Sequence, residues 1–236
     1  MFGRRHAAQL LAEFLGTAVL SMAVYTIIAR TSFPLFSGMA AGGVLALWIM
    51  SVGAISGSHI NPAVTFGLWT TRKIGTLKAI TYIAAQMLGG LAAWQLMNYY
   101  LGRDLTSLVT GGFEWKIFVA EAVGAGIFTF GVASSVFQKA ENSKKAAIQG
   151  FSLFVGVLAA SLASNALLNP AVAVGVQSWS WTYAVAPLAG ALVGMNLYAY
   201  VFDPALTGGK ASAAVSSSSS AKKPVSKAKK TTRKKK

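Results

Sequence analysis

Apolar residues along the chain fall into six long runs separated by short segments that contain polar residues or glycine. A spanning α-helix needs about 20 mainly apolar residues, and each run approaches or reaches that length. The runs are too long and continuous for the alternating strands of a membrane barrel. The pattern predicts an all-α membrane protein with six transmembrane helices, at Ala8–Ala29, Leu35–Gly53, Lys78–Leu101, Trp115–Phe137, Ala147–Ala163 and Trp181–Phe202.

Composition excludes the main soluble classes. The chain is 54% hydrophobic and only 11% charged, which is too apolar for a soluble domain and too patterned for a disordered one. Cysteine is absent, so disulfides, thiolate metal sites and cysteine nucleophiles are excluded. A secretory signal cleaved near Ser21-Met22-Ala23 is the alternative interpretation of the first run, but cleavage would remove Glu13, which belongs to a repeat.

Two polar tripeptides interrupt apolar stretches in matching places. Asn61-Pro62-Ala63 and Asn169-Pro170-Ala171 are each followed by a valine. Asparagine is a good N-cap, and proline is favoured at the first helical position. Each tripeptide therefore predicts the start of a short, re-entrant half-helix at membrane depth.

A constant spacing indicates that the chain is an internal duplication. Glu13 and Glu121 are 108 residues apart, and so are Asn61 and Asn169. We expect a channel domain at 1–205, with one repeat at about 8–101 and the other at about 115–203. Each repeat holds three spans, so the second enters the membrane from the opposite side and the repeats are inverted.

The distribution of lysine and arginine predicts the orientation. Short segments on one side of the six spans carry most of the basic residues, and the cytoplasmic side is normally the richer one. Both termini are therefore expected in the cytoplasm, and we expect the protein in the cell membrane. The basic residues on that side are Arg4, Arg5, Arg72, Lys73, Lys78, Lys139, Lys144, Lys145 and those of the tail.

The sequence resembles the aquaporins, the major intrinsic protein family. The resemblance rests on Ala-Glu-Phe-Leu-Gly-Thr at 12–17, Ser-Gly-Ser-His-Ile-Asn-Pro-Ala-Val-Thr at 56–65 and Leu-Asn-Pro-Ala-Val at 168–172, and it covers about 8–203. It implies a passive channel for water or small neutral solutes, and a homotetramer with one pore per subunit. No cofactor or metal is implied.

The two tripeptides also suggest how such a pore excludes ions. Each half-helix presents its positive dipole end to the membrane midplane, and two such ends repel cations. The Asn61 and Asn169 amides offer donors to a passing oxygen. A water molecule held in this way passes no proton forward.

Extended backbone before each half-helix is predicted to line the pore with carbonyl groups. Irregular backbone at this depth is tolerated where it lines water. The expected acceptors are Gly57, Ser58, His59 and Ile60 in the first repeat, and Asn165, Ala166, Leu167 and Leu168 in the second.

Two acids and one histidine remain to be explained. Glu13 and Glu121 could brace the re-entrant loops by accepting backbone N–H bonds, or they could relay protons in a transporter. We favour bracing, because a buried carboxylate needs several donors and the loops supply them. We interpret His59 as a donor on the pore side and not as a metal ligand, because no second histidine is nearby.

The selectivity filter departs from the family pattern. Most aquaporins carry an arginine directly after the second tripeptide, where this chain has Val172. Alignment from the half-helix asparagines places Ala41, Val157 and Ala166 at the other filter positions. The predicted filter is wide, apolar and uncharged, which favours passage of water and of glycerol, urea, ammonia or gases. An apolar constriction can also dewet and conduct poorly.

The segment 206–236 has a different character. Ten lysines and arginines and no acid lie between Lys210 and Lys236, after a serine run at Ser216–Ser220. We expect a disordered cytoplasmic tail. It could be solvated, bind anionic lipid, or bind nucleic acid less readily.

Two other functions fit parts of the pattern. An ion- or proton-coupled transporter also uses inverted repeats and broken helices, with Glu13 and Glu121 as the available intramembrane charges. A structural membrane protein with an inert pore is the other alternative. We do not expect an enzyme, because the body lacks a cluster of acid, base and nucleophile.

Overall fold

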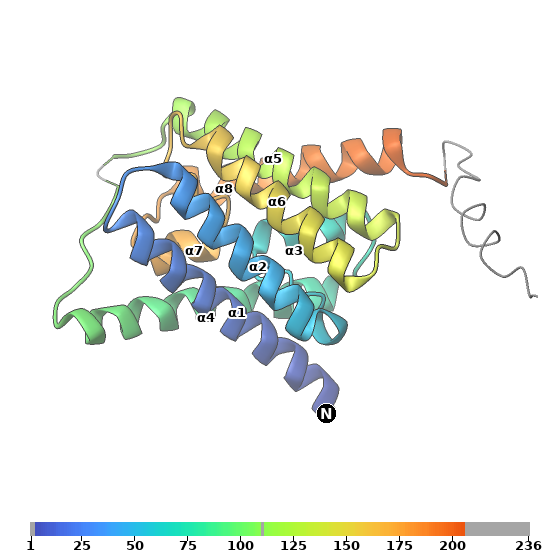
Figure 1. Ribbon diagram of the computed structural model, residues 1–236, viewed down its shortest axis with the longest axis horizontal. Coiled ribbons are helices and arrows are strands. Elements are labelled where there is room, and N and C mark those ends of the chain that lie inside the picture. The colour runs from blue at the N-terminus through green and yellow to red at the C-terminus, as the bar shows by residue number, and fades with distance from the viewer. Residues whose placement is uncertain (1–2, 110, 206–236) are drawn as a thin grey trace, which may run out of the picture.

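The computed structural model describes residues 3–109 and 111–205. The predicted tail at 206–236 lies outside the described residues. Within them the chain forms the six long helices that the apolar pattern predicts, two short helices at the repeated tripeptides, and a final π-helical segment (Figure 1). The elements are α1 (Arg4–Ile28), α2 (Pro34–Ser56), α3 (Pro62–Thr70), α4 (Thr76–Leu101), α5 (Trp115–Phe137), α6 (Asn142–Ala160), α7 (Pro170–Gly175), α8 (Trp181–Leu197) and η1 (Tyr198–Phe202).

Several helices differ from the predicted spans by one to five residues at an end, and the fifth and last spans differ most clearly. The fifth was expected at Ala147–Ala163, but α6 begins five residues earlier, at Asn142. It also ends at Ala160, because the chain must leave the helix to form the loop that leads to α7. The last span is helical from Trp181 as predicted, but it closes with the π-helical turn η1 in place of continuing as an α-helix.

Four of the long helices are apolar enough to cross a membrane on hydropathy alone. They are α1, α2, α5 and the segment Trp181–Phe202. Helix α4 is not among them, although its 26 residues extend about 39 Å, because it carries Gln86, Gln95 and Asn98. Helix α6 is likewise not among them, and its first turns include Lys144 and Lys145.

The helices pack in pairs that follow the sequence duplication. The most extensive contacts join α5 with α8 and α6, α2 with α6, and α1 with α4 and α2. Exchanging α1 with α5, α2 with α6, α3 with α7 and α4 with α8 reproduces this set. Helices α2 and α6 thus meet on the pseudo-twofold axis, and both ends of the described chain lie at the same end of the bundle (Figure 1).

Glycines 108 residues apart allow this central crossing. A Cβ on Gly42 would stand 2.5 Å from the carbonyl oxygen of Gly150, and a Cβ on Gly150 would stand 2.8 Å from that of Gly42. No side chain fits either gap. The absence of a Cβ lets the two backbones touch, as small residues do in membrane bundles.

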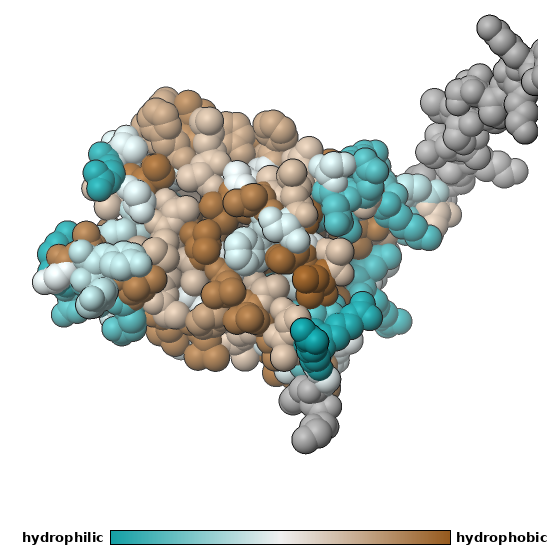
Figure 2. Space-filling model, turned by 60° about the horizontal axis from the view of Figure 1, so that its bottom comes forward, coloured by the Kyte–Doolittle hydropathy of each residue, from teal (hydrophilic) through white to brown (hydrophobic). Residues whose placement is uncertain are grey.

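Polar and apolar side chains are distributed as expected for a protein surrounded by lipid. Large apolar residues such as Met50, Leu77 and Phe151 are more than 60% exposed, whereas Glu13 and Glu121 are completely buried. In Figure 2 a hydrophobic middle lies between hydrophilic residues at the two ends of the long axis. So much exposed apolar surface is stable only in contact with lipid or another apolar surface. The protein is a multi-pass membrane protein.

Candidate functional site

The two short helices begin at the repeated tripeptides. Asn61 caps α3, since its Oδ1 accepts the N–H of Ala63 at 2.8 Å. Asn169 caps α7 and accepts two N–H groups, from Ala171 at 3.0 Å and from Val172 at 3.3 Å. Pro62 and Pro170 occupy the first helical positions, where proline costs no hydrogen bond.

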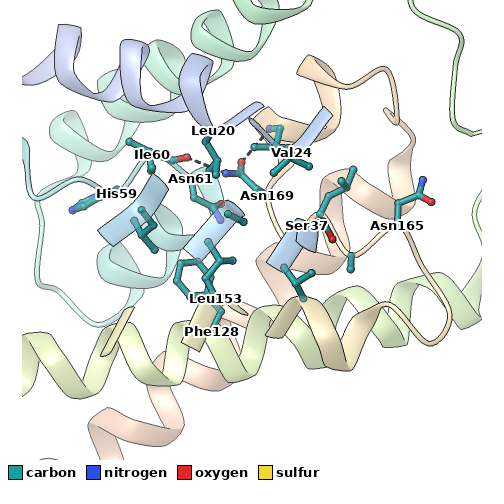
Figure 3. A pocket seen from close by; sticks show the side chains of 16 residues that line it. Leu20, Val24, Ser37, His59, Ile60, Asn61, Phe128, Leu153, Asn165 and Asn169 are labelled. Carbon is teal, nitrogen blue, oxygen red and sulfur yellow. Dashed lines mark hydrogen bonds between the residues drawn. The ribbon is translucent and has the colours of Figure 1, made fainter. Parts of the chain in front are cut away.

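Each asparagine also reaches into the opposite repeat. The Asn61 Nδ2 donates to the carbonyl of Leu168 at 2.9 Å, and the Asn169 Nδ2 donates to that of Ile60 at 2.9 Å. Figure 3 shows Asn61 and Asn169 side by side at the centre of the cavity. The helix starts therefore meet from opposite sides, and one N–H of each amide remains outside these two bonds.

The loops before the half-helices share an unusual backbone. Ser58 and Ile60 have positive φ angles of 53° and 41°, and Ala166 and Leu168, 108 positions later, have 52° and 53°. Non-glycine residues rarely adopt this conformation, and when they do the surrounding structure must hold them there. The two loops are thus equivalent, and each needs a brace.

The carbonyl groups of these loops fall into two sets. Those of Ile60 and Leu168 accept the asparagine amides of the opposite repeat. Within the described chain no donor reaches the other six predicted acceptors. These six are the carbonyl groups of Gly57, Ser58, His59, Asn165, Ala166 and Leu167.

Two buried carboxylates hold the loops. The Glu13 carboxylate accepts the N–H groups of His59 at 3.0 Å and Ile60 at 2.6 Å. The Glu121 carboxylate accepts those of Leu167 at 3.0 Å and Leu168 at 2.7 Å. The two contacts of Glu13 recur at Glu121 with every residue 108 positions later. Hydrogen bonds to a charged acceptor are the strong class, so each glutamate fixes its strained loop.

The third donor to each carboxylate differs between the repeats. Gln86 on α4 donates its Nε2 to Glu13 at 2.8 Å. Ser164, in the loop before α7, donates its hydroxyl to Glu121 at 2.8 Å. Each carboxylate therefore accepts three hydrogen bonds, and neither makes an ion pair with a residue that the structure describes.

All four predicted filter residues line one narrow cavity together with both asparagines. We call Ala41, Val157, Ala166 and Val172 the apolar ring. The cavity volume is about 20 Å³, room for about one ordered water molecule. Of the described residues that line it, none is Asp, Glu, Lys or Arg. His59 lies toward one end and Asn165 toward the other, with the two central asparagines between them (Figure 3).

Comparisons with known proteins agree with this geometry. The profile of a family described as "Major intrinsic protein" matches residues 4–202. The chain belongs to the major intrinsic protein family. Aquaporin TIP1-2 of Zea mays is 36% identical over 67% of this chain and 68% of its own. Aquaporin TIP1-1 of Arabidopsis thaliana is 32% identical over 82% of this chain and 84% of its own.

A solved structure has the same fold as this major intrinsic protein. The X-ray structure of the aquaglyceroporin from Plasmodium falciparum aligns with a TM-score of 0.73, over 85% of this chain and 98% of that chain. The sequences are 20% identical, so this likeness concerns the fold alone. It agrees with an all-α architecture of six spans and two half-helices.

Sequence reasoning missed a chain of polar side chains in the first repeat of this family member. The His59 Nδ1 lies 3.1 Å from the Thr65 hydroxyl, and Gln86 donates to that hydroxyl at 2.9 Å while it also donates to Glu13. In the last spans of the two repeats the offset falls to 101 residues, since Ala85 and Gly89 match Ala186 and Gly190. The second repeat thus has Leu167 and Ala173 in place of His59 and Thr65, and Pro187 in place of Gln86, and none of these has a polar side chain. Thr65 and Gln86 both lie within motifs or repeats recognised in the sequence, but nothing there shows that they touch.

Two buried tyrosines were missed as well. The Tyr82 hydroxyl donates to the carbonyl of Ser56 at 2.9 Å, at the start of the first loop. The Tyr183 hydroxyl accepts the N–H of Asn165 at 2.9 Å, at the start of the second. The tyrosines are 101 positions apart, which is the offset between the last spans of the two repeats, so this spacing could have identified them.

The predicted site residues do not form a metal centre. In the described parts of the chain, three or more His, Asp or Glu side chains nowhere converge as ligands. His59 contacts Thr65 and packs in a T-shaped arrangement with the Tyr82 ring, with 5.2 Å between the ring centroids. Ser37, on α2, is a further polar residue that lines the cavity and that the sequence did not single out.

Proposed function

We propose that this protein is a passive channel for water and small neutral solutes. The proposal rests chiefly on one observation: two asparagine amides from opposite half-helices meet in a narrow cavity lined by no Asp, Glu, Lys or Arg among the described residues. A solute that loses its hydration there can bond to the amides, whereas an ion finds no compensating charge. The printed names of the relatives, aquaporins and an aquaglyceroporin, point to the same class.

Protons are excluded by the same pair of amides. Both half-helices direct positive dipole ends toward Asn61 and Asn169, which raises the local potential. A water oxygen that accepts from an asparagine N–H turns its hydrogens away from the centre, in opposite senses on the two sides. The hydrogen-bonded chain along which a proton would hop is interrupted there.

The apolar ring determines which neutral solutes pass. Alanine and valine side chains neither donate nor accept hydrogen bonds, and Val172 replaces the arginine typical of the family. Size and the cost of dehydration then decide entry. Water, glycerol, urea, ammonia and dissolved gases are the candidates, because they are small and uncharged.

The glutamates favour a passive channel over a proton-coupled carrier. Coupling needs an intramembrane acid that changes partners during transport. Glu13 and Glu121 each accept three hydrogen bonds, two of them from the backbone of a strained loop. Protonating either carboxylate would release the loop that forms the pore wall, so we assign both a bracing role.

The assembly and location follow the family and the charge pattern. We propose that residues 1–205 form the channel body, that four copies assemble with one pore each, and that both termini face the cytoplasm at the cell membrane. The tail at 206–236 is assigned to the cytoplasmic side, where its lysines favour contact with anionic lipid over nucleic acid. Cross-linking and truncation of the tail test these points separately from transport.

Stopped-flow light scattering on proteoliposomes tests the function directly. Vesicles that contain the protein should shrink faster than empty vesicles under an osmotic gradient, and should refill in urea or glycerol. Imposing a proton gradient should produce no current. Permeability equal to that of empty vesicles for water and every neutral solute would rule out the channel, and a proton-driven current would favour the carrier.

A further inference from the structure

The narrow cavity opens at one end into a wider one, which we call the outer vestibule. Its volume is about 260 Å³, and its lining comes from the α1–α2 connection, the start of α2, the α4–α5 connection and the loop before α7. Ser37, Asn165 and Ala166 line both cavities and so mark their junction. Like the narrow cavity, the described lining of the vestibule includes no Asp, Glu, Lys or Arg.

Serine hydroxyls give the vestibule its polar character. Ser32, Ser37, Ser161 and Ser164 line it, together with Thr31. The hydroxyls of Ser37 and Ser161 donate to backbone carbonyls one turn earlier in their helices, at 3.0 Å and 2.7 Å. When a hydroxyl hydrogen points back to its own helix, the oxygen lone pairs remain for a solute.

Acceptors also outnumber donors where the two cavities meet, because the donor groups there bond to other parts of the protein. The Asn165 Nδ2 donates to the Ser178 hydroxyl at 2.8 Å, and the N–H of Ala166 donates to the Ser164 hydroxyl at 2.9 Å. Among the described residues no donor reaches the Ser37 Oγ, the Asn165 Oδ1 or the carbonyl of Ala166. The residues at the junction of the two cavities therefore carry three oxygens that accept no hydrogen bond from the described residues.

We propose that Ser37 and Asn165 form an acceptor site that selects neutral solutes rich in hydrogen-bond donors. The inference rests on the proposed channel function. A solute that enters the apolar ring loses hydrogen bonds to water, and the alanine and valine side chains of the ring form none in their place. Oxygens at its rim can accept from N–H or O–H groups before the last water leaves. Amides of the urea type and short polyols therefore enter more readily than solutes that only accept.

Water depends less on this site than larger solutes do. A water molecule in the vestibule keeps neighbouring waters as partners, whereas urea or glycerol displaces them and must bond to the wall instead. Removing a wall acceptor should therefore slow solutes and leave water largely unaffected. One hydrogen bond of this kind corresponds to about a two- to tenfold change in rate.

The chain offers a matched control for Ser37. Ser51 lies on the same helix and donates its hydroxyl to the carbonyl of Leu47 at 2.8 Å, but it lines neither cavity. Ser51→Ala thus removes the same chemical group and the same type of local bond. A change in permeability that occurs in Ser37→Ala but not in Ser51→Ala is therefore caused by the position of Ser37 in the cavity wall.

The experiment measures water, urea and trimethylamine N-oxide permeability of proteoliposomes; the last solute has one strong acceptor and no donor. The Ser37→Ala/Asn165→Ala double variant should lower urea permeability about tenfold, leave water within about twofold and leave trimethylamine N-oxide unchanged. Ser51→Ala should match the wild type. Normal water permeability with unchanged urea permeability in the double variant overturns this inference alone. Wild-type vesicles no faster than empty ones overturn the channel itself.

A second variant separates chemistry from loop position at Asn165. Ser178→Ala removes the bond that anchors the Asn165 amide but leaves its acceptor oxygen in place. Urea permeability in Ser178→Ala should stay above that of Asn165→Ala. Equal losses in the two variants would assign the effect to the position of the loop and overturn the role of the Asn165 oxygen.

Discussion

The two repeats build the same re-entrant loop with different support. In the first, a polar chain of His59, Thr65 and Gln86 leads to the bracing carboxylate of Glu13. In the second, Leu167, Ala173 and Pro187 occupy the equivalent positions, and Ser164 alone supplies the third bond to Glu121. The loop geometry thus depends on the glutamate and the capping asparagine, which both repeats have. The polar chain is an addition to one of them.

The largest difference between the repeats is expected at the residue after each tripeptide. Val64 and Val172 are equivalent and both buried, but only Val172 lines the cavity. Val64→Arg would bury an unpaired charge in the core and should abolish folding, a loss of more than about 4 kcal/mol. Val172→Arg can direct its charge along the pore, so it should fold and conduct a narrower range of solutes.

Size-exclusion chromatography in detergent and the solute panel check both variants. A folded Val64→Arg protein would contradict the assignment of Val64 to the core. An unchanged solute range in Val172→Arg would contradict the placement of Val172 in the filter.

Substitution of either glutamate by glutamine should lower the stability of the protein by nearly the same amount. In Glu13→Gln and Glu121→Gln, an amide nitrogen would face backbone N–H donors that the carboxylate had accepted. Each variant should lose about 3–5 kcal/mol of stability, because buried charge-assisted bonds are lost and donors are left unpaired. Thermal unfolding of both proteins in the same detergent measures this. A large difference between them would mean that the polar chain, and not the carboxylate, holds the first loop.

Substitution of the two capping asparagines should lower the stability of the protein by moderately different amounts. Asn169 accepts two N–H groups of α7, whereas Asn61 accepts one of α3. Loss of an N-cap costs about 0.5–2 kcal/mol, and each variant also loses the bond to the opposite repeat. Asn169→Ala should therefore lower the midpoint of thermal unfolding more than Asn61→Ala. The reverse order would show that the longer helix α3 depends more on its cap.

The smallest loss of stability is expected at Thr65 and Ala173, equivalent positions at which the two repeats have different residues. Thr65→Ala gives the first repeat the alanine of the second and should cost about 1–2 kcal/mol, because Gln86 and His59 each lose a partner. Ala173→Thr gives the second repeat a hydroxyl with no glutamine beside it. Thermal unfolding of both, with Thr65→Ser as the control that restores the hydroxyl, shows whether the polar chain stabilises the first loop.

Much of this architecture follows from the sequence. The spans from Trp115 and from Trp181 were placed correctly at their starts, since each begins at an abrupt change from polar to apolar residues. The contact of Glu13 with the first loop was predictable, because the common offset of 108 residues pairs the two intramembrane acids, Glu13 and Glu121, with the two half-helices. Ala147–Ala163 was placed less well, since its apolar residues continue beyond Ala160 into a loop whose conformation is determined by tertiary contacts.

Other features depend on contacts that no local pattern encodes. The bonds from Asn61 to Leu168 and from Asn169 to Ile60 arise only when the two repeats face each other. For the same reason, two of the eight predicted carbonyl acceptors already have a protein donor. Ser37 lies one turn before Ala41, a predicted filter residue, and its sequence context is that of any serine in a membrane helix, so only the cavity identifies it.

The exchanged asparagine bonds have a consequence for biosynthesis. Each joins groups that are 107 or 109 residues apart, so the first re-entrant loop lacks its partner while the second repeat is still being made. At about 5–20 residues per second, that interval lasts roughly 5–20 s. During this time the Ile60 carbonyl and the Asn61 amide must stay hydrated or find a temporary partner. The first re-entrant loop can therefore complete its hydrogen bonds only after the second half-helix has been made.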